Sequence, residues 1–159
     1  MSHIAQFNIG RMRAPLTDPL MQGFVSQLVT INQLAEEAAG FVWRLQTPAG
    51  DATSIRIYDD DWLIVNMSVW ESIEALWDFT YKTQHAQVLS HRKEWFERLD
   101  APILVLWWIA EGETITAEDG KTRLEHLRQH GPTPQAFTFK VRFPDPQAVA
   151  QTTAHDNES

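Results

Sequence analysis

The chain has 159 residues, no cysteine, and 13 basic against 21 acidic side chains, which give a formal net charge of −8. This length suits one domain with a proper core, and the missing cysteine excludes disulfides, thiolate metal sites and thiol nucleophiles. The negative charge argues against binding to nucleic acid or anionic lipid, because both need clustered Lys and Arg. No apolar run reaches the roughly 18 residues of a membrane span, and no signal peptide is recognisable, so we expect a cytoplasmic protein.

The N-terminal part of the chain alternates between strand and helix patterns. Asp18 followed by Pro19 is typical of a helix start, because the Asp side chain can cap the first N–H groups and Pro needs no hydrogen bond there. The apolar stripe of that helix ends before Gly40. The expected elements are a strand at 3–12, a helix from 19 to 39, a strand at 41–46, and residues 54–58, which either continue that strand or begin another.

Two stretches in the second half of the chain are apolar at nearly every position, as expected of strands that are covered on both faces. A helix start follows the second of them, where Thr116 and Asp119 resemble a capping box. Gly131 and Pro132 end that helix. The expected elements are strands at 62–70 and 103–109, a helix from 71, a second helical stretch from 86 to 99, a helix from 116 to 130 and a last strand at 136–139.

The order of these elements predicts an α+β fold. Its first six elements have the βαββαβ order of a ferredoxin-like domain, to which a C-terminal helix and strand are added. Such a sheet has helices on one face only, so we expect a second copy to cover the other face in a sheet-to-sheet homodimer. We expect the domain to span 1–143, and 144–159 to form a disordered acidic tail, because these last residues contain no aromatic and no Lys or Arg.

Several segments resemble a bacterial domain family of the dimeric α/β-barrel superfamily that has no assigned reaction. These segments are NIGRMRAPLTDPLM, GFVWRLQ, VNMSVWESIEALWDFTYKTQHAQVLSHRKEWF, VLWWI and GPTPQAFTF, and the resemblance covers about residues 3 to 140. The superfamily includes antibiotic-biosynthesis monooxygenases that use no cofactor and oxygenases that degrade haem. The resemblance therefore implies the dimeric barrel fold and a pocket between helices and sheet.

Asn66 and Trp70 lie four residues apart on the expected strand at 62–70 and so point to the same face. Small quinone-forming monooxygenases of the superfamily have a similar Asn-x-x-x-Trp, which is thought to hold an aromatic substrate whose carbanion reacts with oxygen. An amide and an indole N–H can both stabilise a developing enolate oxygen. The alternative is that Trp70 is a core aromatic and Asn66 a hydrogen-bonded buried amide.

His85 is the first candidate for an acid, a base or a haem ligand, because its ordinary pKa lies near neutrality. In the haem-degrading relatives an axial histidine lies on the equivalent helix, and an asparagine lies on the first strand, where this chain has Asn8. His85 comes about one helical turn earlier than that ligand, and Phe79 stands near the position of a tryptophan. The alternative is a histidine that caps a helix or packs in the core.

No metal site is expected. His126 and His130 have the i, i+4 spacing of a chelating pair, but no third ligand follows at a suggestive spacing. Two functions of different class stay open. The first is a monooxygenase-like enzyme that acts on a small aromatic or apolar substrate with Asn8, Asn66, Trp70 and His85. The second is a non-catalytic protein that binds a small molecule, or haem through His85, or serves as a structural dimer module.

Overall fold

Four antiparallel strands form one sheet in the computed structural model, which describes residues 2–83 and 85–147. The strands of this described part are β1 (Ser2–Arg11), β2 (Phe41–Arg44), β3 (Leu63–Trp70) and β4 (Leu104–Ala110). Their order across the sheet is β2-β3-β1-β4, and each neighbouring pair is antiparallel. The α+β class is thereby confirmed. Residues 54–58 form neither a continuation of β2 nor a separate strand.

The helices begin where the sequence has capping residues. Asp18 accepts a hydrogen bond of 2.9 Å from the backbone N–H of Leu20, and Thr116 and Asp119 form the expected capping box. Gly131 ends the last helix with a positive φ of 72°. The helices are η1 (Pro19–Met21), α1 (Gln22–Glu37), α2 (Ile73–Lys82), α3 (His85–Ser90), α4 (Arg92–Trp95) and α5 (Ala117–His130).

The expected helix from 86 to 99 is shorter and broken in the structure. It is divided into α3 and α4 and ends at Trp95. It ends there because the next residues pair with the end of β1: Phe96 bridges to Met12, and the N–H of Glu97 donates to the carbonyl of Arg11 at 2.9 Å. The end of β1 thus competes with the helix for these backbone groups.

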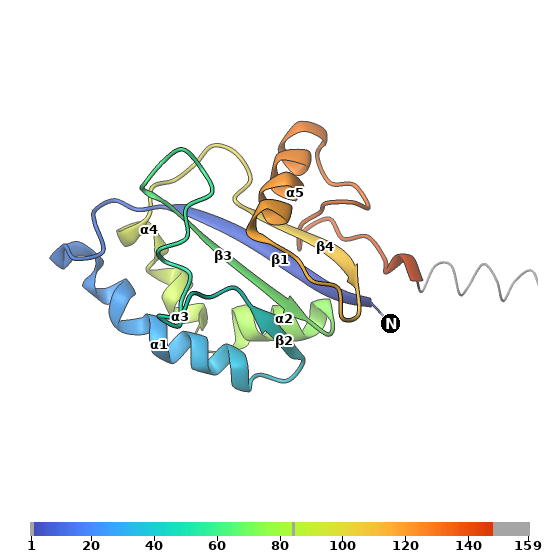
Figure 1. Cartoon of the computed structure of the whole chain (residues 1–159), viewed down its shortest axis with the longest axis horizontal. Coiled ribbons are helices and arrows are strands. Elements are labelled where there is room, and N and C mark those ends of the chain that lie inside the picture. Colours follow the sequence, from blue (N-terminus) through green and yellow to red (C-terminus); the bar gives the residue numbers. More distant parts are fainter. Residues whose placement is uncertain (1, 84, 148–159) are drawn as a thin grey trace, which may run out of the picture.

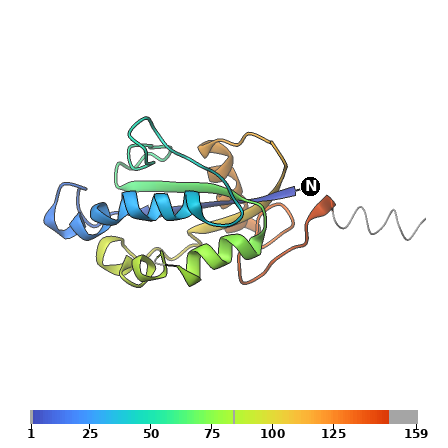
Figure 2. The same cartoon turned by 90° about the horizontal axis from the view of Figure 1, so that it is seen from below.

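The two faces of the sheet are covered by different elements (Figure 1). The odd face comprises Ala5, Phe7, Ile9, Val65, Met67, Val69, Val105, Trp107 and Ile109, and it packs against α5. The even face comprises Ile4, Gln6, Asn8, Ile64, Asn66, Ser68, Trp70, Leu104 and Leu106, and it looks toward α1 and α2. Figures 1 and 2 both show α1 lying beside α3 on the side away from α5.

α5 belongs to the same chain as the sheet face that it covers. Leu124 and Leu127 of α5 are buried on the odd face, and Gly120 lets the helix approach the ring of Phe7. The segment after β2 adds partly buried side chains such as Ile55 and Tyr58 to the same cluster. The uncovered face from which the sequence predicted a sheet-to-sheet dimer is therefore filled within one chain.

The expected last strand at 136–139 is reduced to one bridge. Phe137 exchanges two backbone hydrogen bonds with Leu106 of β4, of 2.8 and 2.9 Å. A tight turn that pairs Thr133 with Ala136 precedes the bridge, and Phe139 packs edge-on against Trp77 of α2. Phe137 and Phe139 both pack in the cluster on the even face, so side-chain contacts rather than further backbone pairs hold this segment after the one bridge.

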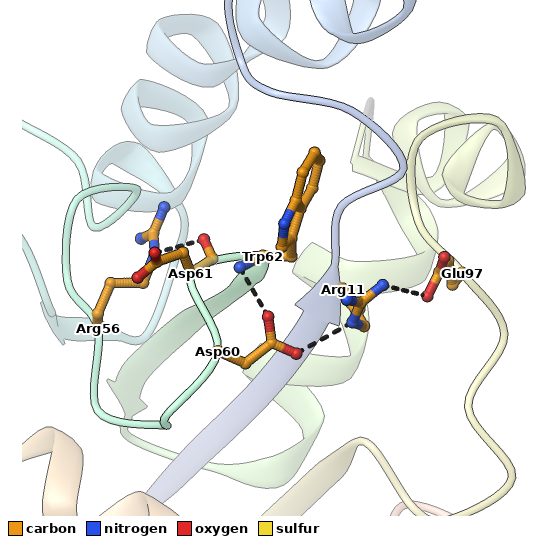
Figure 3. Close-up of polar contacts among 6 residues, drawn as sticks. All are labelled: Arg11, Arg56, Asp60, Asp61, Trp62 and Glu97. Atoms are coloured by element: carbon orange, nitrogen blue, oxygen red, sulfur yellow. Dashed lines mark hydrogen bonds and ion pairs between the residues drawn. The ribbon is translucent and has the colours of Figure 1, made fainter.

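An ion-pair network joins three segments at the end of β1 (Figure 3). Arg11 donates to Asp60 at 3.0 Å and to Glu97 at 2.7 Å. The backbone N–H of Trp62 also donates to Asp60, and this bond, followed by that from Arg11, lowers the pKa of the Asp60 carboxyl. The network ties the loop before β3 and the loop after α4 to the sheet.

Two further expectations concern the C-terminal tail and membrane spans. The sequence predicted a tail at 144–159, and residues 148–159 of it lie outside the described residues. Among the described residues, no helix combines the length and the apolar character needed to cross a membrane.

Candidate functional site

A cavity of about 580 Å³ lies between the even face of the sheet and the helices α1 to α4. Its walls are apolar and come from the helices, including Phe24 and Ile31 of α1, Phe79 of α2, and Trp95 of α4. This volume falls within the roughly 300–1,000 Å³ typical of small-molecule sites. Asn8, Asn66, Trp70 and His85, the four residues that the sequence singled out, all line it.

The floor of the cavity is a network of amides on the two central strands. The register of β1 and β3 sets Gln6 opposite Ser68 and Asn8 opposite Asn66. Gln6 donates to the side-chain oxygens of Asn66 and Ser68 at 2.7 and 2.8 Å. Asn8 donates to Gln6 at 2.9 Å and to Asn66 at 3.3 Å. Four polar side chains thus interlock on a face whose other strand residues are largely apolar.

The direction of these bonds determines what the floor offers to a ligand. Asn66 Oδ1 accepts from both Gln6 and Asn8, so its two lone pairs are used. The Asn66 side chain is exposed, and its NH₂ group donates to no described residue. Hydrogen-bond donors therefore remain available on the floor, whereas the acceptor of Asn66 does not.

Trp70 forms a wall of the cavity. Its side chain has no solvent exposure, and its ring stacks on Phe79 at a centroid distance of 5.0 Å and an angle of 25°. The indole N–H donates to Ser68 at 2.9 Å. Because this bond satisfies the only polar group of Trp70, the residue contributes shape and an aromatic surface in this arrangement.

His85 begins α3 and lies at the α2 side of the cavity. Its Nδ1 is 3.2 Å from the carbonyl oxygen of Thr80, and its ring lies 5.0 Å from that of Phe79. A carbonyl oxygen only accepts, so Nδ1 carries the proton and Nε2 has a free lone pair. Burial lowers the pKa of His85, and the bond to Thr80 opposes that effect. The imidazole is therefore held neutral, with Nε2 as its basic atom.

Arg92 lines the same cavity and was not identified from the sequence as a site residue. Its Nη2 donates to the carbonyl of Ile9 at 2.8 Å, and its guanidinium lies 4.9 Å from the centroid of Phe96. Burial lowers its pKa. In the described part of the chain it forms no ion pair with a carboxylate. A signal was present, because Arg92 follows His85 by seven residues on one helical stripe.

Gln6 and Ser68 also belong to the site without having been proposed. Gln6 was visible as one of two amides at alternate positions of the first strand, two residues before Asn8. Ser68 lies between Asn66 and Trp70 on their side of β3 and bonds to Gln6 and Trp70. The buried amide pattern of the first strand was thus the signal that could have found this network.

No metal centre is present among the described residues: no three His, Cys, Asp or Glu side chains come together in a geometry that could hold an ion. The rings of His126 and His130 lie 4.6 Å apart on α5. His126 Nε2 is engaged with the hydroxyl of Thr133 at 2.9 Å. This pair lies on the helix that covers the odd face and takes no part in the cavity.

Comparison with known proteins identifies a family. A domain family described as a domain of unknown function (DUF3291) matches residues 3–153. No curated protein is a significant match to the chain. A solved structure, of the protein of unknown function NE2512 from Nitrosomonas europaea, is similar with a TM-score of 0.45 and 8% identity, over 73% of this chain and 95% of that one. Because the family model spans most of its length, the chain belongs to the DUF3291 family.

Proposed function

We propose that the chain binds a small aromatic or apolar molecule in the cavity and removes a proton from it, as cofactor-independent monooxygenases do. One observation carries the proposal: Asn8, Asn66, Trp70 and His85 line a single apolar cavity of about 580 Å³. These residues lie on two strands and a helix that are separated in sequence, so their convergence is a property of the fold.

The proposed chemistry assigns a role to each side chain. His85 is the base, because Nδ1 is bound to a carbonyl and Nε2 is left as a neutral acceptor. The NH₂ group of Asn66, on the floor that Asn8 helps to hold, donates to the oxygen on which negative charge develops. Trp70 stacks on Phe79 and so backs the aromatic wall against which an aromatic substrate can lie.

Dioxygen is the co-substrate in this proposal. The deprotonated substrate supplies the electrons, one oxygen atom enters the product, and the other leaves as water. For a dihydroxynaphthalene the products are a hydroxynaphthoquinone and water, which balances the dioxygen consumed. The protein then needs only to bind, deprotonate and stabilise the anion.

Binding is tested with two tryptophan substitutions on neighbouring residues of α1. Leu28 lines the cavity, whereas Val29 is 68% exposed on the other side of the helix. Leu28→Trp should fill the cavity and weaken binding of naphthalene probes at least tenfold, and Val29→Trp should leave it unchanged. Catalysis is tested by oxygen uptake with a dihydroxynaphthalene, which His85→Gln should abolish. Binding that is insensitive to Leu28→Trp would place the ligand elsewhere and end the proposal.

Haem binding through His85 is the second candidate function. The bond from Nδ1 to the Thr80 carbonyl favours it, because metal-bound histidines usually direct their other ring nitrogen to such a partner. Bound haem would supply redox chemistry that no side chain here provides. Titration with haemin should then give a Soret shift that is lost in His85→Ala. A missing shift, or one that survives this substitution, excludes His85 as the ligand.

We also propose a ferredoxin-like topology and a homodimer. The strand order β2-β3-β1-β4 supports the topology. A dimer would need a surface other than the one that α5 covers. The exposed side chains of Val42 and Trp43 on the edge strand β2 supply an apolar surface of this kind. Light scattering should give near twice 18.3 kDa, and a monomer mass would dismiss the dimer.

A further inference from the structure

A positive charge lies in the wall of the cavity without a described counter-ion. Arg92 is held by its bond to the Ile9 carbonyl and by the ring of Phe96, and no described carboxylate pairs with it. A guanidinium stays charged even where burial lowers its pKa, because its ordinary value lies far above neutrality. A cation in such a site is costly unless an anion accompanies it.

The other charged residues of the lining do not compensate Arg92. Arg44 pairs with Glu36 at 2.8 Å, and Lys140 is exposed. Asp51 is the one described acid of the lining, and its carboxylate is bonded to the backbone and hydroxyl of Thr53 at 2.9 and 2.6 Å. The cavity is therefore positive in a chain whose formal net charge is −8.

Two side chains of the cavity lining, Arg92 and Asn66, have hydrogen-bond donors that no described residue uses. A guanidinium has five N–H groups, and Arg92 uses Nη2 for one recorded bond. Ile9, which accepts that bond, follows Asn8 in β1, and Asn8 faces Asn66, whose NH₂ group donates to no described residue. Arg92 and Asn66 thus both contribute donors to the lining of one cavity.

The geometry points to an organic anion as the ligand: we propose that a carboxylate binds to Arg92, with the NH₂ group of Asn66 as a second donor, while the apolar body of the ligand extends toward Phe79 and Trp70. This inference rests on the proposed function and specifies its substrate class. His85 begins α3 and Arg92 begins α4, so the base and the anchoring cation lie on different helices of the cavity wall. The carboxylate is then held by a different helix from the one that carries the base, so it anchors the substrate and does not react.

The test compares two naphthalene probes of nearly equal shape. A naphthalene carboxylate carries the charge, and the corresponding naphthalene carboxamide is neutral. Calorimetric titration of the wild-type protein should show that the carboxylate binds about tenfold tighter or more, as expected of a charge-assisted bidentate contact. Arg92→Met should remove this preference, so that the two probes bind about equally. Arg98→Met, the same change at an exposed residue outside the cavity, should preserve it.

The outcomes separate this inference from the function on which it rests. If neither probe binds to the wild-type protein, the cavity is not a ligand site and both proposals fail. If both probes bind equally well, the anionic ligand is refuted while the cavity remains a binding site. If the preference survives Arg92→Met, Arg92 is not the anchor of the carboxylate and the inference fails. Equal binding of the two probes to the wild-type protein refutes the anionic ligand even if Arg92→Met does not fold.

Discussion

Gly120→Ala tests whether α5 lies on the odd face of the sheet. A Cβ atom at this position would lie 2.3 Å from Cδ2 and 2.5 Å from Cγ of Phe7, where ordinary contacts begin at 3.4 Å. The helix or the ring must therefore move by about 1 Å, and Phe7 is completely buried. Overpacking of this kind costs about 1–3 kcal/mol, against which the higher helix propensity of Ala returns up to about 1 kcal/mol. We expect a net loss of about 1–2 kcal/mol.

Guanidinium unfolding followed by tryptophan fluorescence measures this loss, which corresponds to a decrease in Tm of about 2–8 °C for a chain of this size. Gly23→Ala is the matched control, because Gly23 is also helical and a Cβ atom there would lie 3.0 Å from Trp95. This milder contact should leave the stability nearly unchanged. If Gly120→Ala is as stable as the wild-type protein, α5 does not approach Phe7, and the odd face is open to another partner.

Three further substitutions test the site and the network at the end of β1. Ser68→Ala removes the acceptor of the buried Trp70 N–H and should cost about 1–3 kcal/mol in chemical unfolding; an unchanged stability would contradict that bond. His85 has a lowered pKa when folded, so its contribution to stability is complete above about pH 6.5 and is lost as the pH falls. His85→Gln should therefore flatten the dependence of Tm on pH between about 5 and 7, and equal slopes would refute the burial of this imidazole. Asp60 also has a lowered pKa, so Asp60→Asn should lower Tm at neutral pH. This difference in Tm should shrink in acid and in high salt, because the contact of Asp60 with Arg11 weakens under both conditions. A difference in Tm that does not depend on pH would contradict the network.

The elements that the sequence predicted well are those with local causes. Asp18 and Thr116 cap their helices through side chains two or three residues away, so the signal lies within one turn. The strands around Asn66 and Trp107 are apolar runs bounded by turns or breakers. The helical stretch after His85 and the strand around Phe137 were mispredicted in extent, because the first ends where its backbone groups pair with the end of β1, and the second pairs with β4 only at Leu106. Such competition cannot be seen in a local pattern.

Within the site, too, the features with local causes could be predicted from the sequence, and those that depend on distant contacts could not. Asn66 and Trp70 could be paired because a strand alternates its side chains, whatever the rest of the fold does. That Asn8 faces Asn66 depends on the register of β1 against β3, which no single strand encodes. Arg92 escaped notice because an arginine on a helix is usually a solvated residue. Its bond to Ile9 and the absence of a described carboxylate partner become visible only in three dimensions.

The two faces of the sheet differ in composition, and this difference favours a ligand site on the even face. α5 completes a core on the odd face that is almost wholly apolar. On the even face, the two central strands instead carry Gln6, Asn8, Asn66 and Ser68, although apolar side chains would stabilise a purely structural sheet at least as well. Departures of this kind from the pattern of a stable core are expected at functional sites. The NH₂ group of Asn66 donates to no described residue, and Arg92 adds a positive charge to the lining of the same cavity, so both features favour a ligand with oxygen acceptors.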